Sequence, residues 1–133
     1  MITGLNHLTI AVSNLSRSFG FYTDVLGFDP QGSWANGAYL SAGDLWLCLT
    51  LETAMPARDY THYALSVNDA DFAECVKKIE SYGSTCWKNN TSEGSSYYFL
   101  DPDGHKLEIH CGDLESRLVA VESKPYTGWS YPK

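Results

Sequence analysis

The sequence predicts an α+β fold built from two βαβββ modules, and three observations lead to this prediction. Two segments begin alike, NHLTIAVSNL at 6–15 and THYALSVNDA at 61–70, each with a histidine in second place. In both, apolar and polar residues alternate as in a half-buried strand, and apolar residues at helical spacing follow. The chain has 133 residues, enough for one domain. Because neither copy is large enough to bury its own sheet, we expect them to pair around one core.

The first module is predicted over residues 3–52. Its helix begins after a cap at Ser13 or Asn14, carries apolar residues at helical spacing up to Leu26, and stops at Gly27. Its strands are expected at 5–12, in a short stretch before Trp34, at 37–41 and at 45–51. Residues 53–59, which contain Pro56 and show no periodicity, are the predicted linker.

The second module is predicted over residues 60–112 and repeats the same order. A strand at 60–67 leads into a capped helix that ends at Gly83. Three strands follow, at 85–88, 95–101 and 105–111, with the turn DPDG before the last. Residues 113–133 are expected to form a short helix and an aromatic tail, so that residues 1–133 make a single domain.

Composition excludes several classes of function. The net charge is −7, from nine basic and sixteen acidic residues without a basic stripe, which argues against nucleic-acid binding. No apolar run approaches the roughly 20 residues of a membrane span, and the N-terminus lacks the features of a signal peptide. We therefore expect a cytoplasmic protein without membrane contact.

The histidines of the repeat fall on corresponding faces of their strands. His7 shares a face with Thr9, and His62 shares one with Ala64, in both cases opposite the apolar face. Glu108 adds a carboxylate in the middle of a strand, where an acid is tolerated only with a partner or a metal. A single histidine is more often structural than functional. Two imidazoles and a carboxylate together, however, suit Mn, Fe, Co, Ni or Zn and leave open positions for a substrate.

Several segments resemble the fosfomycin-resistance glutathione transferases of the vicinal oxygen chelate superfamily, from about residue 3 to residue 129. They are LNHLTIAV, GAYL, LWLCL, DYTHYA, SEGSSYYFLDPDGHKLEIH and SRL. The resemblance implies that His7, His62 and Glu108 bind a divalent ion, typically Mn(II). It also implies a homodimer whose modules pair across the two chains in cupped mixed sheets. His7 would then come from one chain, and His62 with Glu108 from the other.

The resemblance further implies an anion pocket beside the metal. The residues matching the family's phosphonate site are Lys88, Ser92, Tyr98 and Arg117, with Thr9 at the same centre and Trp46 and Cys48 lining the pocket. The guanidinium group of arginine, the ammonium group of lysine and hydroxyl donors are well suited to bind a phosphonate. From the residues alone, Tyr97 competes with Tyr98 for the inward position. Asn90, Gly94 and Ser96 match a K⁺ site in the neighbouring loop.

The implied reaction is addition of the glutathione thiol to the epoxide of fosfomycin, with Thr9 assisting the thiol. Trp34, Asn36, Tyr39 and Thr50 resemble the family's glutathione site. Several relatives carry an arginine, a possible partner for a glutathione carboxylate, at the position of Thr91. Use of a thiol other than glutathione is therefore an alternative. A second alternative is an epoxide hydrolase, for which Asp44 is the only acid in the neighbouring strands. A third is a non-catalytic drug-binding protein of the same fold.

Overall fold

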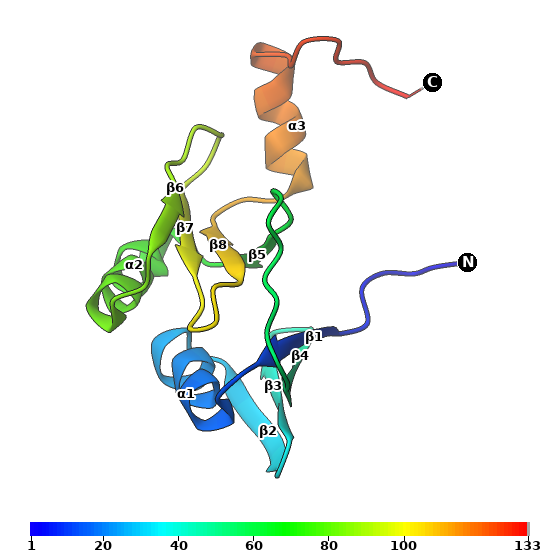
Figure 1. Cartoon of the computed structure of the whole chain (residues 1–133). Helices are drawn as coiled ribbons and strands as arrows, with labels where there is room; N and C mark the ends of the chain where they lie inside the picture. Colours follow the sequence, from blue (N-terminus) through cyan, green and yellow to red (C-terminus); the bar gives the residue numbers. More distant parts are fainter. Residues whose placement is uncertain (133) are drawn as a thin grey trace.

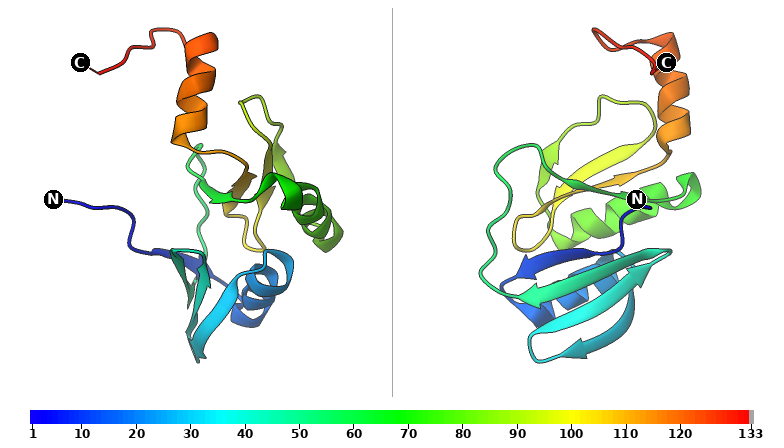
Figure 2. Two further views of the ribbon diagram at one scale, coloured as in Figure 1. Left: turned by 180° about the vertical axis from the view of Figure 1, so that it is seen from behind. Right: turned by 90° about the vertical axis from the view of Figure 1, so that its right-hand side faces the viewer.

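The computed structural model describes residues 1–132 and confirms the predicted α+β class (Figure 1). The first half contains β1 (Leu8–Val12), α1 (Leu15–Gly20), the π-helical turn η1 (Phe21–Val25), β2 (Asp29–Trp34), β3 (Gly37–Ala42) and β4 (Leu45–Leu51). The second half contains β5 (Tyr63–Ser66), α2 (Asp69–Tyr82), β6 (Cys86–Lys88), β7 (Ser96–Leu100) and β8 (Lys106–His110). The last helix is α3 (Leu114–Ser123), which extends away from both sheets in each view of Figure 2.

The two halves have the same sheet topology. One sheet has the order β1-β4-β3-β2 and the other β5-β8-β7-β6. In both, the first strand pairs in parallel with the last strand of its module, and the remaining pairs are antiparallel. β1 and β5 therefore lie at sheet edges, each with one row of backbone groups not paired within its own sheet. Both predicted histidines precede these edge strands, since β1 begins at Leu8 and β5 at Tyr63.

The first helix differs from the continuous helix that the spacing predicts. Asn14 is the N-cap, with its side chain accepting from the N–H of Arg17 at 3.0 Å, but regular α-helix ends at Gly20. The Thr23 hydroxyl donates to the Phe19 carbonyl at 2.7 Å and competes for that acceptor. The N–H of Leu26 then bonds the Phe21 carbonyl, five residues back, at 3.1 Å, which is the π-helical pattern.

One core serves both halves. Its buried members include Phe21 and Leu49 from the first half and Ile79, Phe99 and Leu107 from the second. The rings of Phe21 and Phe99 approach to 6.3 Å across the junction. Full burial of such a side chain contributes about 1.5–3 kcal/mol. Neither half would keep this burial alone, which confirms the expectation of a shared core.

The turn between β7 and β8 fastens the second half to the first. The Tyr22 hydroxyl donates to Asp101 Oδ2 at 2.9 Å, and Arg17 Nη2 lies 3.1 Å from Asp103 Oδ1. The ring of His105 bonds the Ala11 carbonyl at 2.7 Å. Burial, with the Asp101 charge adding to it, raises the pKa of Tyr22 well above its usual range, and burial also raises the pKa of Asp101. Among the described residues, no helix is both long enough and apolar enough to cross a membrane.

Candidate metal and anion site

The face of the second sheet opposite the core carries a row of polar side chains. The register places Ala64 beside Glu108, Glu108 beside Tyr98 and Tyr98 beside Lys88, across β5, β8, β7 and β6. Neighbours in register point to the same side of a sheet. Glu108 is only 6% exposed although it is an acid. The predicted face for Glu108 is therefore confirmed, and its carboxylate is the natural starting point for a site.

His62 faces Glu108 in an arrangement suited to a cation. Its Nδ1 lies 2.8 Å from the Tyr60 carbonyl, so the ring proton sits on Nδ1. Its Nε2 lies 3.0 Å from Glu108 Oε1. In a neutral ring this nitrogen is an acceptor, and so is the carboxylate oxygen. Two acceptors at this distance need a second proton on the ring or a bound cation. A histidine whose far nitrogen is held by a carbonyl is typical of metal ligands.

His7 shows the same pattern but lies on the other sheet. Its Nδ1 donates to Asn6 Oδ1 at 2.7 Å, which leaves Nε2 free, and its ring packs on Trp46 with centroids 4.4 Å apart. Within residues 1–132 of one chain, no cluster of three or more His, Cys, Asp or Glu side chains could hold a metal. The structure thus brings His62 and Glu108 together but does not bring His7 to them.

Lys88 and Tyr98 lie next to this pair. Lys88 Nζ donates to the Tyr60 hydroxyl and lies 4.6 Å from the Tyr60 ring centroid and 4.9 Å from that of Tyr98. The bond to the Tyr60 hydroxyl is the largest cause of a raised pKa at Lys88, which keeps the ammonium group charged. Tyr97 instead packs on Phe99 on the core side, at 6.1 Å. The register therefore decides the choice between the two tyrosines in favour of Tyr98.

The loop between β6 and β7 is closed by Asn90. Its Oδ1 accepts from the Ser92 N–H at 3.0 Å and the Ser92 hydroxyl at 2.9 Å, and its Nδ2 donates to the Gly94 carbonyl at 2.9 Å. Gly94 has a φ of +74°, and a Cβ there would lie 2.4 Å from the Cys111 carbonyl oxygen. Only glycine allows this approach. The loop is thus held against the end of β8, close to Glu108.

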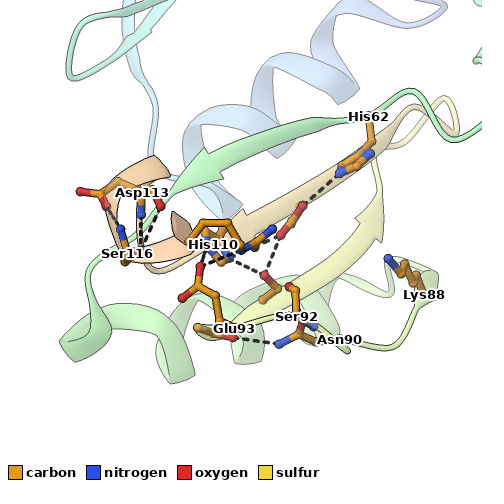
Figure 3. Close-up of polar contacts among 12 residues, drawn as sticks. His62, Lys88, Asn90, Ser92, Glu93, His110, Asp113 and Ser116 are labelled. Carbon is orange, nitrogen blue, oxygen red and sulfur yellow. Dashed lines mark hydrogen bonds and ion pairs between the residues drawn. The ribbon is translucent and has the colours of Figure 1, made fainter. Parts of the chain in front are cut away.

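Polar contacts continue from Glu108 toward α3 (Figure 3). The Ser96 hydroxyl lies 2.6 Å from Glu108 Oε2 and 2.6 Å from His110 Nδ1. On its other side, His110 Nε2 lies 3.7 Å from Glu93 Oε1. The same carboxylate oxygen accepts from Arg117 Nε at 2.9 Å, and this bond is the largest cause of a raised pKa at Arg117. Arg117 therefore lies near the loop but is paired with Glu93.

The remaining predicted residues lie on the first sheet. Trp34, Tyr39 and Trp46 form an aromatic strip, with successive ring centroids 4.8 and 5.4 Å apart. Thr9 is in register with Cys48, and Cys48 with Tyr39, so they share the face opposite the core. Of the residues expected at the glutathione site, two remain. Thr50 is half-buried on β4, and Asn36 is exposed in the turn between β2 and β3. These residues accompany His7, on a different sheet from Glu108.

Three residues of the site were missed by reasoning from the sequence: Tyr60, Glu93 and His110. Alternation along the strand does predict that His110 shares a face with Glu108, two positions away, but it assigns His110 no role in the site. Tyr60 precedes His62 by two positions, but nothing in the sequence shows that its carbonyl and hydroxyl are used. Glu93 contacts His110 and Arg117, which are distant from it in sequence.

Comparison with known proteins gives a consistent result. The model of the Glyoxalase/Bleomycin resistance protein/Dioxygenase superfamily matches residues 4–109. Glutathione transferase FosA of Serratia marcescens is 50% identical over 133 residues, covering 96% of this chain and 94% of that protein. Metallothiol transferase FosB of Staphylococcus epidermidis is 39% identical over 134 residues, with 95% of this chain and 96% of that protein covered.

Solved structures agree in fold. The fosfomycin resistance protein FosX of Mesorhizobium loti superposes with a TM-score of 0.78 at 30% identity, covering 89% of this chain and 99% of that one. FosX of Listeria monocytogenes in complex with Mn(II) and a sulfate ion gives a TM-score of 0.81 at 28% identity, covering 90% and 98%. The two sheets described above are thus a known arrangement.

Proposed function

This chain belongs to the Glyoxalase/Bleomycin resistance protein/Dioxygenase superfamily, and from that premise we propose that it is a metal-dependent thiol transferase that inactivates fosfomycin. Its similarity to FosA and FosB, along almost the whole of each chain, supports thiol transfer. The single structural observation that carries the proposal is the His62–Glu108 pair, in which His62 Nε2 lies 3.0 Å from Glu108 Oε1.

The donor set fits a divalent ion. Two imidazole nitrogens and one carboxylate are the donors of His7, His62 and Glu108. Both rings have Nδ1 engaged, and in His62 the other ring nitrogen, Nε2, faces Glu108 Oε1 at 3.0 Å. We take Mn(II) as the ion, and its presence in the complex of Listeria FosX supports that choice. A bound divalent ion supplies Lewis-acid stabilisation of negative charge on a substrate oxygen.

Because one chain holds only part of the donor set, the proposal includes a homodimer. β1 and β5 are edge strands, and edges of this kind pair readily with another chain. In a two-fold dimer, β1 of one protomer would lie along β5 of its partner, and the reverse contact would form as well. His7 stands just before β1 and His62 just before β5, so this pairing would complete two equivalent sites.

The substrate anion would be bound by Lys88, Ser92, Tyr98 and Arg117. Lys88 and Tyr98 lie in one row with Glu108 and provide an ammonium group and a hydroxyl. Arg117 gives its Nε to Glu93 and lines the same cleft as Ser92. Cationic and hydroxyl donors of this kind suit a phosphonate. The oxygen atoms of Asn90, Gly94 and Ser96 would bind K⁺ in the adjoining loop.

The thiol would approach along the first sheet, over Trp34, Asn36, Tyr39 and Thr50. In the reaction, the thiol sulfur bonds to an epoxide carbon, the C–O bond breaks, and the thiol proton ends on the released oxygen. A free thiol has a pKa of about 8.5, so its ionisation must be assisted. Thr9, on the same open face, is the residue proposed to assist it. We propose glutathione as the thiol, supported by the 50% identity to FosA.

Hydrolysis is the second candidate, because several structural neighbours are FosX proteins. One of these, a Listeria FosX mutant, was crystallised with Mn(II) and a dihydroxypropylphosphonic acid. Hydrolysis needs a carboxylate that activates water beside the epoxide. Asp44 is the acid that the sequence suggests, but it lies exposed in the turn between β3 and β4. Its position favours thiol transfer.

The proposal is tested by mass spectrometry of fosfomycin incubated with protein, Mn(II), K⁺ and one thiol at a time. We expect a product heavier by one thiol, formed most rapidly with glutathione and absent with His62→Ala. A product heavier by one water would establish the hydrolase. Unchanged drug after incubation with the metal-loaded protein would favour the alternative of a non-catalytic drug-binding protein. Faster reaction with bacillithiol or cysteine would contradict the choice of glutathione.

A further inference from the structure

Glu93 and His110 connect Arg117 to Glu108, yet the proposed function gives neither of them a task. Arg117 Nε lies 2.9 Å from Glu93 Oε1, which lies 3.7 Å from His110 Nε2. His110 and Ser96, and then Ser96 and Glu108, follow at 2.6 Å each. We propose that Glu93 and His110 are positioning residues that couple the orientation of Arg117 to that of Glu108. This inference rests on the proposed function, in which Arg117 binds the anion and Glu108 the metal.

At one end of this chain of contacts, Glu93 holds Arg117 in place. The Arg117 side chain is 33% exposed and that of Glu93 21%, so water screens this pair less than a fully exposed one. Tyr126 also contributes a side-chain hydrogen bond to Arg117, and the N–H donors that Glu93 and Tyr126 leave would bind the anion. A cleft of about 520 Å³ adjoins them, lined by Arg117, Glu93, Ser92 and Lys124 among others. Without Glu93, Arg117 would be free to adopt other rotamers and would lose this preorganisation.

At the other end, the available protons determine which group donates in each hydrogen bond. An ionised carboxylate only accepts, so the single Ser96 hydroxyl proton goes to Glu108 Oε2. The Ser96 oxygen then accepts from His110, which places a proton on His110 Nδ1. His110 thereby orients the hydroxyl that holds one oxygen of Glu108, while the other oxygen faces His62. This is the arrangement by which outer residues commonly orient a metal-binding carboxylate.

The His110 ring has little room to move, so a shift at Glu93 would reach Ser96. Gly94 and Gly112 pack against it with φ values of +74° and +131°. A Cβ on Gly94 would lie 3.1 Å from His110 Cε1, and one on Gly112 would lie 3.1 Å from His110 Nε2. These backbone segments come from the β6–β7 loop and from the connection between β8 and α3. The ring is therefore enclosed by the loop that carries Glu93 and by the connection that leads into α3, the helix that carries Arg117.

The first test removes the charge of Glu93 at constant size, with Glu93→Gln, and compares it with Glu122→Gln on the exposed part of α3. Mn(II) binding is measured by electron paramagnetic resonance on protein without substrate. We expect the Mn(II) dissociation constant to rise about threefold to tenfold in Glu93→Gln and to stay at the wild-type value in Glu122→Gln. We also expect the KM for fosfomycin to rise more than kcat falls. A purely structural role would lower the melting temperature and leave Mn(II) affinity unchanged.

A double-mutant cycle decides whether the effect passes through His110. If it does, Glu93→Gln combined with His110→Asn will bind Mn(II) no more weakly than His110→Asn alone. Additive losses, or wild-type Mn(II) affinity in Glu93→Gln, would overturn the coupling. Because Mn(II) binding is measured without fosfomycin, the two proposals fail separately. Weakened Mn(II) binding in the variant supports the coupling even if the wild type forms no thiol adduct.

Discussion

At the scale of single residues, the carboxylate of Glu108 is the costliest group in the site. It is 6% exposed, and within hydrogen-bond distance its two oxygens meet one hydroxyl and one nitrogen of the His62 ring, while His110 Nδ1 lies farther away, at 3.6 Å. A buried charge with so few donors is unfavourable unless a cation completes its surroundings. The residue therefore serves binding at the expense of stability.

Glu108→Gln tests this interpretation. The amide keeps the volume and can still accept from Ser96, but it removes the charge. We expect Mn(II) affinity to fall on the order of 100-fold or more, measured by titration calorimetry. We also expect the melting temperature of the metal-free protein to stay the same or rise. A fall of more than about 5 °C in the metal-free variant, roughly 1 kcal/mol for a domain of this size, would contradict the account.

At the scale of elements, the β6–β7 loop and the β7–β8 turn place the site. The loop requires glycine where it approaches the end of β8. The turn fastens the second half to η1, α1 and β1 through Asp101, Asp103 and His105, respectively. For each of these two segments, a substitution can be chosen whose effect on stability is measured by unfolding, without an activity assay.

Gly94→Ala should destabilise the loop through steric overlap with the Cys111 carbonyl. Gly43→Ala is the matched control, because Gly43 also has a positive φ (+56°) but no neighbouring atom within 4 Å of the place that a Cβ would take. The backbone strain alone costs about 1–2 kcal/mol. We expect urea denaturation to show that cost for Gly43→Ala and a clearly larger loss for Gly94→Ala. Equal losses would mean that the loop moves away without cost.

Tyr22→Phe should change the dependence of stability on pH. Burial raises the pKa of Tyr22 well above 10.0 in the folded protein. Above about pH 10 the unfolded chain releases this proton while the folded protein retains it, so the wild type loses stability as pH rises. The variant lacks this loss but also lacks the bond to Asp101, worth about 1.5–3 kcal/mol at neutral pH. The difference in unfolding free energy should therefore shrink between pH 8 and pH 11. A constant difference would contradict the burial of this hydroxyl.

Strands, faces and caps could be predicted because they depend on local patterns. Alternation placed Glu108 and Leu107 on opposite faces of β8, and the structure agrees. The π-helical turn at Phe21 could not be predicted in this way, because it depends on one hydroxyl competing for one carbonyl. The contacts of Glu93 could not be predicted from the sequence either, because they form only where a loop, a strand and a helix meet. The position of His7 relative to Glu108 depends on how the two halves are joined.

In the assembled protein, each metal site would be completed by two chains. One chain presents His7 on the first sheet and the His62–Glu108 pair on the second, and no three-ligand cluster forms among its described residues. Both sheets have an edge strand next to a histidine. A protein that binds its metal within one chain would tolerate separation of the protomers, whereas the proposed shared site would be lost.

The most direct measurement is complementation between His7→Ala and His62→Ala. Neither variant alone should bind Mn(II) at the site or modify fosfomycin. Mixed and allowed to exchange protomers at equal amounts, they should regain about a quarter of the wild-type Mn(II) sites and activity, because half of the dimers are mixed and each contains one intact site. No recovery, with exchange verified by native mass spectrometry, would contradict a metal site shared between two chains.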